Sequence, residues 1–296
     1  MMDADAGAAD FMDRFREDME RQRDLMDALN GESPVEDLRR WLADPPRSFD
    51  EEDHGRLFKL ALSGHKSGCP DFPLAVRKEL IEMLLSHGIN PAADGETPLF
   101  VCATAEEAAM LLDGGVPIDA REEGPMGDTA LLHHTKLLVT QHKQGLVVLT
   151  TRFNLIRFLV SRGADLGARD ANGNIAEKFA RQIELRENFL AHKGGMHSSL
   201  IPGGLFATCA DFLEAVRVAG SYKAYARAPR IELARLRLLC ARSLASPPPV
   251  LARLFAAELP NGVFWSVLSF WRSSREIFDD EYADALTAAL EDASLV

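Results

Sequence analysis

The sequence lacks the features that mark several large protein classes. Its only cysteines lie far apart without a Cys-x-x-Cys pair: Cys69, Cys102, Cys209 and Cys240. Neither a zinc site nor a disulfide framework is therefore indicated, and we expect a reducing compartment. No apolar run approaches the roughly 20 residues of a membrane-spanning helix, and the acidic start at 1–5 favours neither a secretory signal nor a transit peptide. We expect a cytoplasmic protein without membrane contact; the lack of a dense Lys/Arg cluster leaves nuclear residence open.

Motifs of catalysis are missing as well. The chain contains no Gly-x-Ser-x-Gly, no His-Glu-x-x-His and no paired Cys/His cluster, and its glycine-rich stretch 194–204 lacks the Lys-Ser/Thr ending of a phosphate loop. His133 and His134 are adjacent, and neighbouring side chains on a helix point about 100° apart, so they cannot easily share a metal ion. We expect no enzyme, no cofactor and no metal, and we expect both histidines to pack between helices.

Charge is unevenly distributed along the 296 residues, whose net charge is −12. Residues 1–53 hold 17 acidic and 7 basic side chains, whereas residues 217–253 hold eight basic side chains and a single acid, Glu232. The basic residues are Arg217, Lys223, Arg227, Arg230, Arg235, Arg237, Arg242 and Arg253. The acidic total argues against broad nucleic-acid binding, and we expect none, while the basic stretch offers a local face to an anionic partner.

An internal repeat is present in the middle of the chain. Four segments open with a glycine, at Gly55, Gly95, Gly127 and Gly173, with spacings of 40, 32 and 46 residues. In the first three, a short apolar helix pattern is followed by a second one that ends in a further glycine, at 88, 115 and 163. A glycine directly after a helix favours the positive φ that ends it. The pattern predicts a stack of helix pairs.

The repeated segments resemble ankyrin repeats. Residues 95–102 match the Gly-x-Thr-Pro-Leu-His opening of that family, and 158–170 match its Leu-Leu-x-x-Gly-Ala-Asp closing. The resemblance implies an all-α solenoid of four to five irregular repeats with short β-turn fingers over 24–195. The repeats lie at about 24–53, 54–94, 95–126, 127–172 and 173–195. Extra residues at 64–74 and 138–151 fall between the two helices of a repeat.

Three further segments complete the predicted domain organisation. An acidic helical arm is expected at 1–23, a Gly/Ser hinge at 196–204 and a helical C-terminal region at 205–296. In that last region Pro229 is expected to separate helices at 206–227 and 230–245. The region also resembles the C-terminal part of ankyrin-repeat proteins from unicellular algae, which implies kinship but little about function.

The ankyrin resemblance implies that finger tips and the concave face of the first helices hold a protein partner. The candidate partner-binding residues are Arg121, Glu122, Glu123, Arg169, Asp170 and Asn172. For each of them the alternative is a solvated turn with local hydrogen bonds. We expect a monomeric, non-catalytic scaffold that binds a protein of unknown identity.

The C-terminal region carries an alternative function. Leu236, Cys240 and Leu244 follow one another at four-residue spacing, which resembles the Elongin-binding part of a suppressor-of-cytokine-signalling box. The stretch 259–270 resembles either the cullin-contacting half of that box or the start of an F-box. This likeness implies a substrate receptor of a cullin-type ubiquitin ligase. The competing interpretation is a helical cap that seals the last repeat and buries the three side chains on the chain's own helices.

Overall fold

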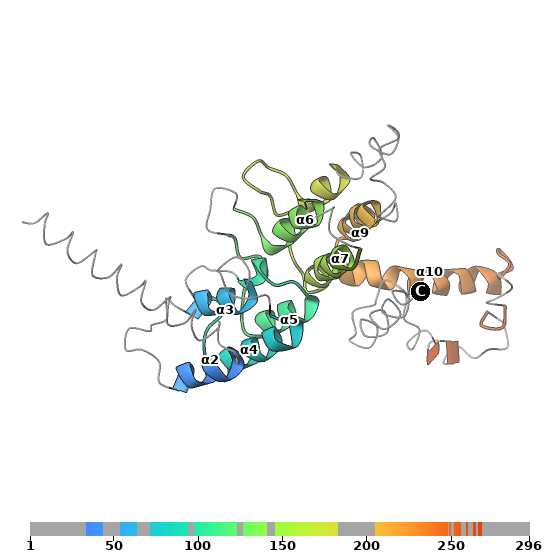
Figure 1. The fold of residues 1–296 in the computed structure, drawn as a ribbon. Coiled ribbons are helices and arrows are strands. Elements are labelled where there is room, and N and C mark those ends of the chain that lie inside the picture. The colour runs from blue at the N-terminus through green and yellow to red at the C-terminus, as the bar shows by residue number, and fades with distance from the viewer. Residues whose placement is uncertain are drawn as a thin grey trace, which may run out of the picture. The chain divides into compact units, whose positions relative to one another are not determined.

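The computed structural model describes residues 34–43, 54–63, 72–93, 98–122, 127–140, 146–182 and 205–247, with 249, 252–255, 259, 263–264 and 266–267. Across these residues the regular structure is helical, with one isolated β-bridge between Arg121 and Thr129, so the predicted all-α class is confirmed (Figure 1). The predicted arm at 1–23 and hinge at 196–204 lie outside the described residues. The chain forms two compact units, Met1–Ala210 and Asp211–Val296.

The helices of the first unit form pairs in which the first helix is shorter than the second, at 10 against 13, 3 against 9 and 11 against 16 residues. They are α2 (Pro34–Ala43), α3 (His54–Ser63), α4 (Leu74–Ser86), the 3₁₀ helix η4 (Pro98–Phe100), α5 (Ala105–Asp113), α6 (Ala130–Thr140) and α7 (Leu146–Ser161). A further helix covers 176–182.

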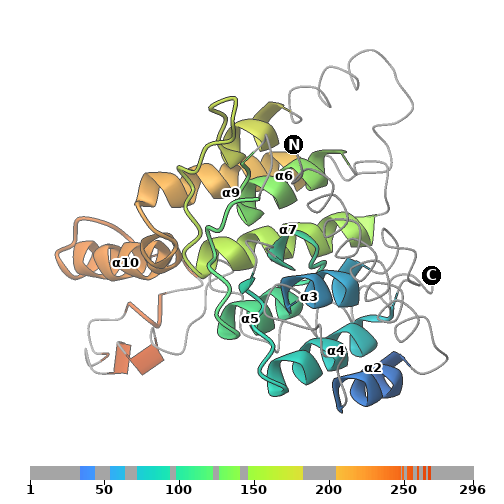
Figure 2. The same cartoon turned by 90° about the vertical axis from the view of Figure 1, so that its left-hand side faces the viewer.

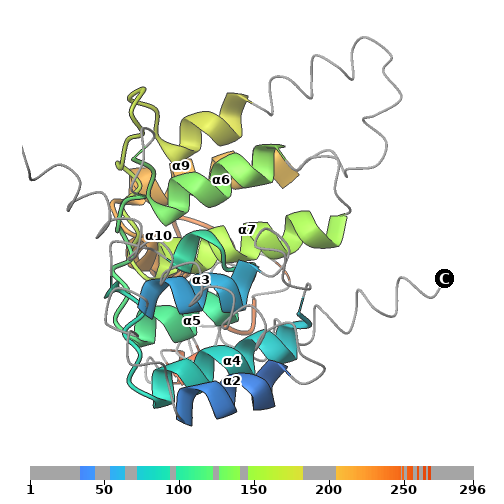
Figure 3. The same ribbon diagram turned by 60° about the vertical axis from the view of Figure 1, so that its left-hand side comes forward.

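These helices form two stacked layers. In one layer α3 contacts η4 and η4 contacts α6, and in the other α2, α4, α5 and α7 touch in that order. Contacts between α3 and α4, η4 and α5, and α6 and α7 join the layers (Figures 2 and 3). Neighbouring helix pairs therefore pack on one another, as the internal repeat predicts.

The buried faces of the second helices use equivalent positions. Leu80, Ile81 and Leu84 in α4 are fully buried, and Leu155, Ile156 and Leu159 occupy the same places in α7. Full burial of each such side chain is worth roughly 1.5–3 kcal/mol. In α5 the equivalent residues are Glu107, Ala108 and Leu111, which are also 0% exposed. A carboxylate thus stands in α5 where the other two helices carry leucine.

Three second helices end with the same backbone geometry. Gly88, Gly115 and Gly163 have φ values of +75°, +98° and +100°, a region that glycine enters at little cost. Each glycine N–H donates to the carbonyl three residues earlier, at 3.0, 3.0 and 3.1 Å. The next residue donates to the carbonyl five residues earlier, at 3.1, 3.1 and 3.0 Å. This is a Schellman ending, and it confirms the positive φ predicted at these glycines.

In the second unit the boundary between two helices differs from the prediction. Helix α9 (Leu205–Ala219) ends at Gly220, whose φ is +81°, and α10 (Tyr222–Ala241) begins after Ser221. The Ser221 hydroxyl accepts a hydrogen bond from the Ala224 N–H at 3.2 Å, so it caps α10. Pro229 lies inside α10. The predicted break at Pro229 is wrong, because the glycine–serine pair supplies both a helix stop and a helix start eight residues earlier.

The second unit has a small aromatic core of its own. Phe255 and Phe264 are 6% and 2% exposed, and their rings lie 6.2 Å apart. Partly buried side chains of α10 pack against them, including Leu233, Leu236 and Cys240. One face of α10 is therefore covered by residues that follow it in the chain.

Candidate protein-binding site

Two turns that connect successive helix pairs share their hydrogen bonds. After Gly115 the Ala120 N–H donates to the Pro117 carbonyl at 3.1 Å, and after Gly163 the Ala168 N–H donates to the Asp165 carbonyl at 3.2 Å. The residue that follows is an arginine in both cases. These equivalent turns project exposed residues from one edge of the first unit.

The two arginines close their turns. Arg121 Nη1 donates to the Gly127 carbonyl at 2.6 Å, and Arg169 Nη1 donates to the Gly173 carbonyl at 2.8 Å. Arg121 Nη1 also donates to the Arg169 carbonyl at 3.0 Å, which joins the two turns. Both arginines are exposed, but their guanidinium groups already bind the backbone. Their first role is to hold the shape of the edge.

Asp170 is buried at 6% exposure, unlike the other predicted tip residues that the structure describes. Its carboxylate accepts hydrogen bonds from the Asn172 and Asn174 N–H groups at 2.9 and 2.8 Å. Lys136 Nζ lies 3.2 Å from the same carboxylate and 2.7 Å from a carboxylate oxygen of Asp128. Asp170 therefore links its turn to α6 through an ion pair with Lys136, and its carboxylate is not exposed to solvent.

The pKa values agree with this ion triad. Burial alone would raise the pKa of Asp170, but the hydrogen bonds of Asn174 and the charge of Lys136 lower it below its ordinary 3.8. Burial alone would lower the pKa of Lys136, but its contacts with Asp128 and Asp170 raise it above 10.5. The Asp170 carboxylate and the Lys136 ammonium group are thus both charged at neutral pH.

The remaining predicted tip residues are Glu122, Glu123 and Asn172. Glu122 and Asn172 are exposed, and of the two only Glu122 carries a charge. Their backbone N–H groups are used within the turns, since Glu122 donates to the Asp128 carbonyl at 2.9 Å. Glu123 lies outside the described residues. The side chains of Glu122 and Asn172 are therefore the predicted contacts that remain available to a partner.

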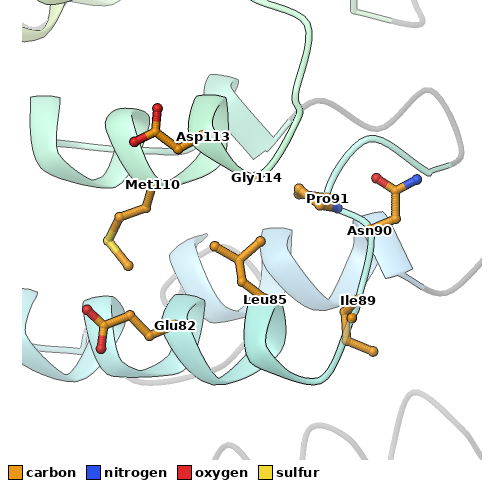
Figure 4. Close-up of a pocket in the computed structure, with 9 residues that line it drawn as sticks. Glu82, Leu85, Ile89, Asn90, Pro91, Met110, Asp113 and Gly114 are labelled. Carbon is orange, nitrogen blue, oxygen red and sulfur yellow. The ribbon is translucent and has the colours of Figure 1, made fainter.

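A groove between α4 and α5 was not predicted from the sequence. It has a volume of about 630 Å³ and opens between the C-terminal ends of the two helices (Figure 4). Leu85 and Met110 line its middle, while Glu82 and Asp113 stand at its rim. The signal in the sequence is an acid three residues from an apolar side chain on both α4 and α5, at Glu82 with Leu85 and at Asp113 with Met110. Such a groove suits an aliphatic side chain next to a cation.

A glycine lies beside the groove. A Cβ at Gly114 would lie 2.7 Å from Leu85 Cδ2, so a larger residue at position 114 would make the Leu85 side chain shift. Asp113 at the rim is paired with Arg162, which directly follows α7, at 3.5 Å. The pair is exposed and contributes little to stability.

One cluster near the turns has the atoms of a metal site. The ligand atoms of Glu122, Asp128 and His133 lie within 4.8 Å of one another. However, Lys136 Nζ is 2.7 and 2.9 Å from the two carboxylate oxygens of Asp128. A divalent cation would have to displace this ammonium group, so the geometry favours the ion pair.

A buried histidine and cysteine lie between the helix pairs. His134 Nε2 donates to the Leu99 carbonyl at 2.7 Å, because Arg152 Nη1 donates to the other ring nitrogen at 2.8 Å and makes it the acceptor. Cys102 Sγ lies 3.8 Å from His134 Nε2. Burial raises the pKa of Cys102, and burial with the charge of Arg152 lowers the pKa of His134 well below 6.5. Both groups are neutral, whereas a nucleophilic cysteine needs the opposite shift.

The predicted ligase-docking stripe is divided by the structure. Leu236 and Cys240 pack against the Phe255 and Phe264 cluster, whereas Leu244 is 70% exposed. Two of the three side chains are thus packed within the second unit, and the third is exposed to solvent.

No protein-family model, curated protein or solved structure matched the chain when it was compared with them. None of the helices in the described part of the chain combines the length and the apolar character needed to cross a membrane.

Proposed function

We propose that the chain is a non-catalytic scaffold of the ankyrin type that binds a protein partner. The observation that carries the proposal is the recurrence of one local structure. Three second helices end in the same Schellman geometry, and two of the following turns close with the same arginine-to-carbonyl bond. Repeats of this kind build extended surfaces that are largely formed before binding.

The proposed contact surface is the edge formed by the two turns. Arg121 joins them through the carbonyls of Gly127 and Arg169, so the exposed Glu122 and Asn172 are presented from a braced backbone. A partner that binds such an edge loses little affinity to the ordering of loops. The groove between α4 and α5, beside Leu85 and Met110, offers a second surface for a partner to contact.

A test of the scaffold uses the full chain with two changes at the edge. Glu122→Arg with Asn172→Arg reverses or adds charge at exposed tips while Asp128, Lys136 and Asp170 themselves are kept. Partners are captured from native lysate and quantified by mass spectrometry. Glu36→Arg on α2 is the control, since Glu36 is also exposed.

The proposal predicts that a defined set of proteins is lost with the tip variant and retained with the control. Equal capture by all three chains would contradict binding through this edge. Circular dichroism establishes that the variants keep their helices.

The ubiquitin-ligase receptor remains a second proposal because Leu244 is exposed at 70%. Leu244→Glu tests it, since this side chain lies outside the aromatic cluster and its change leaves that packing intact. Loss of Elongin, Skp1-like or cullin subunits with this variant alone would support the receptor. Their absence from the wild-type capture would contradict it. Cys240→Arg is less informative, because Cys240 packs on Phe255 and Phe264.

A further inference from the structure

Helix α10 carries a regular stripe of exposed side chains on one face. Residues 227, 231, 235, 238 and 242 are separated by four, four, three and four positions, which places them on one side of a helix. All five are exposed. They alternate in chemistry along the stripe: Arg227, Ile231, Arg235, Leu238 and Arg242. The two aliphatic side chains are 48% and 51% exposed.

The opposite face of α10 is occupied by the unit's own core. Leu233 and Leu236 pack on the aromatic cluster, and the Arg237 guanidinium lies 4.1 Å from the centre of the Phe264 ring. Arg237 also donates to the Leu259 carbonyl at 2.5 Å. Arg237 is therefore fixed, and the helix is held so that the stripe faces away from the core.

The arginines of the stripe have no such partners. Within the part of the chain that the structure describes, the guanidinium groups of Arg227, Arg235 and Arg242 make no hydrogen bond, ion pair or ring contact. Glu232 is the one acid among residues 217–253. The stripe is therefore a positive surface whose charge is not neutralised on α10 itself.

We propose that this stripe docks an acidic amphipathic helix of a partner protein. Ile231 and Leu238 are seven residues apart and so occupy the same position in successive heptads. Arg235 and Arg242 each follow four residues later, at the flanking position that pairs with acids of a facing helix. The complementary partner has an aliphatic residue in each heptad and Glu or Asp beside it.

The arrangement favours a protein helix over an anionic membrane. A helix that lies on a membrane needs a continuous apolar stripe with cations at its margins. On α10 each aliphatic side chain stands between two arginines, so no continuous apolar stripe forms along this face. Arginine also pairs with carboxylates in a bidentate geometry, which suits a partner with fixed acids.

This surface is independent of the proposed edge, since it lies on α10 in the other unit. Variants of Glu122 and Asn172 should leave binding at the stripe unchanged. Failure of one proposal is thus distinguishable from failure of the other.

The test uses the full chain and a synthetic peptide of about three heptads, with leucine at the core positions and glutamate at the flanking positions. Mutual repulsion of the glutamates keeps the peptide from pairing with itself. Binding is followed by fluorescence anisotropy of the labelled peptide. We expect each single Arg→Gln change at 227, 235 or 242 to weaken binding about two- to fivefold, and added salt to weaken it further.

A charge swap gives the decisive comparison. The triple variant Arg227→Glu, Arg235→Glu and Arg242→Glu should no longer bind the glutamate peptide. It should instead bind a peptide in which lysine replaces glutamate. Arg253→Glu is the matched control, since Arg253 is exposed but lies outside α10, and it should bind as the wild type does. A scrambled glutamate peptide of equal charge should bind weakly to every chain.

Three results would overturn the proposal. One is no binding of the glutamate peptide to the wild-type chain, and another is an equal loss with the Arg253 control. The third is binding of the wild-type chain to phosphatidylserine vesicles without binding to the peptide, which would assign the stripe to a membrane.

Discussion

Replacement of Glu107 should destabilise the first unit more than its position on a short helix suggests. The side chain is 0% exposed. Its Oε2 accepts hydrogen bonds from the Ala103 and Thr104 N–H groups at 2.7 and 3.0 Å. Its Oε1 lies 2.8 Å from Arg77 Nε, and the Arg77 side chain is only 17% exposed. One carboxylate thus caps α5 and neutralises a largely buried cation.

The expected cost follows from both roles. Glu107→Ala removes the hydrogen bonds to the Ala103 and Thr104 N–H groups, which are each worth about 1 kcal/mol. It also leaves Arg77 without its counter-charge, for which buried pairs give about 3–5 kcal/mol. We expect a total loss of about 3–5 kcal/mol, because the two roles share one group and do not add fully. Glu107→Gln keeps the acceptor oxygen and should lose less.

A double-mutant cycle separates the pair from the packing. Urea unfolding, followed by circular dichroism, is measured for the wild type, Arg77→Met, Glu107→Leu and the double variant. The double variant should be more stable than either single variant, since it places leucine at the position that Leu80 and Leu155 occupy in the other helices and removes both charges. A loss below about 1 kcal/mol for Glu107→Ala, or purely additive losses in the cycle, would refute the reasoning.

Three further predictions concern stability. Asp170 has a lowered pKa, so its contribution is complete above pH 3.8 and is lost as the pH falls through the folded-state pKa; urea unfolding of wild type and Asp170→Asn should differ most near neutral pH and converge in acid. Gly163→Ala should cost about 1–2 kcal/mol, because φ is +100° there, whereas Ala at a helical surface position should not; thermal unfolding compares the two, and an unchanged melting temperature would contradict the Schellman ending. Pro229→Ala should stabilise the second unit by up to about 3 kcal/mol, because proline within α10 has no N–H for the helix ladder and its ring crowds the preceding turn; a loss of stability in urea would show that the ring has a packing role.

The sequence predicted the parts of the fold that depend on local physics. The glycines at 88, 115 and 163 follow apolar helix patterns, and positive φ after a helix is a local preference. The apolar spacing at Leu155, Ile156 and Leu159 likewise predicts a buried face. The structure confirms these features, and the family to which they are similar stays a prediction.

Other features depend on residues distant in the sequence and could not be predicted. Asp170 looks like a solvated turn residue until Lys136, 34 positions earlier, is placed beside it. In the groove, Leu85 lies against Gly114, which is 29 positions later in the sequence. The helix break predicted at Pro229 is wrong for a local reason. Gly220 and Ser221 end one helix and start the next, and this local signal is stronger than that of a proline inside α10.

The buried pair of Arg77 and Glu107 makes the order of the helix pairs irreplaceable. A helix pair that carries a buried glutamate can stand only beside a neighbour that supplies the arginine. Deletion, duplication or exchange of either pair would leave a buried charge without its partner, which would lower the free energy of unfolding by several kcal/mol. Recombination within this array is therefore restricted to breakpoints that keep the two partners together.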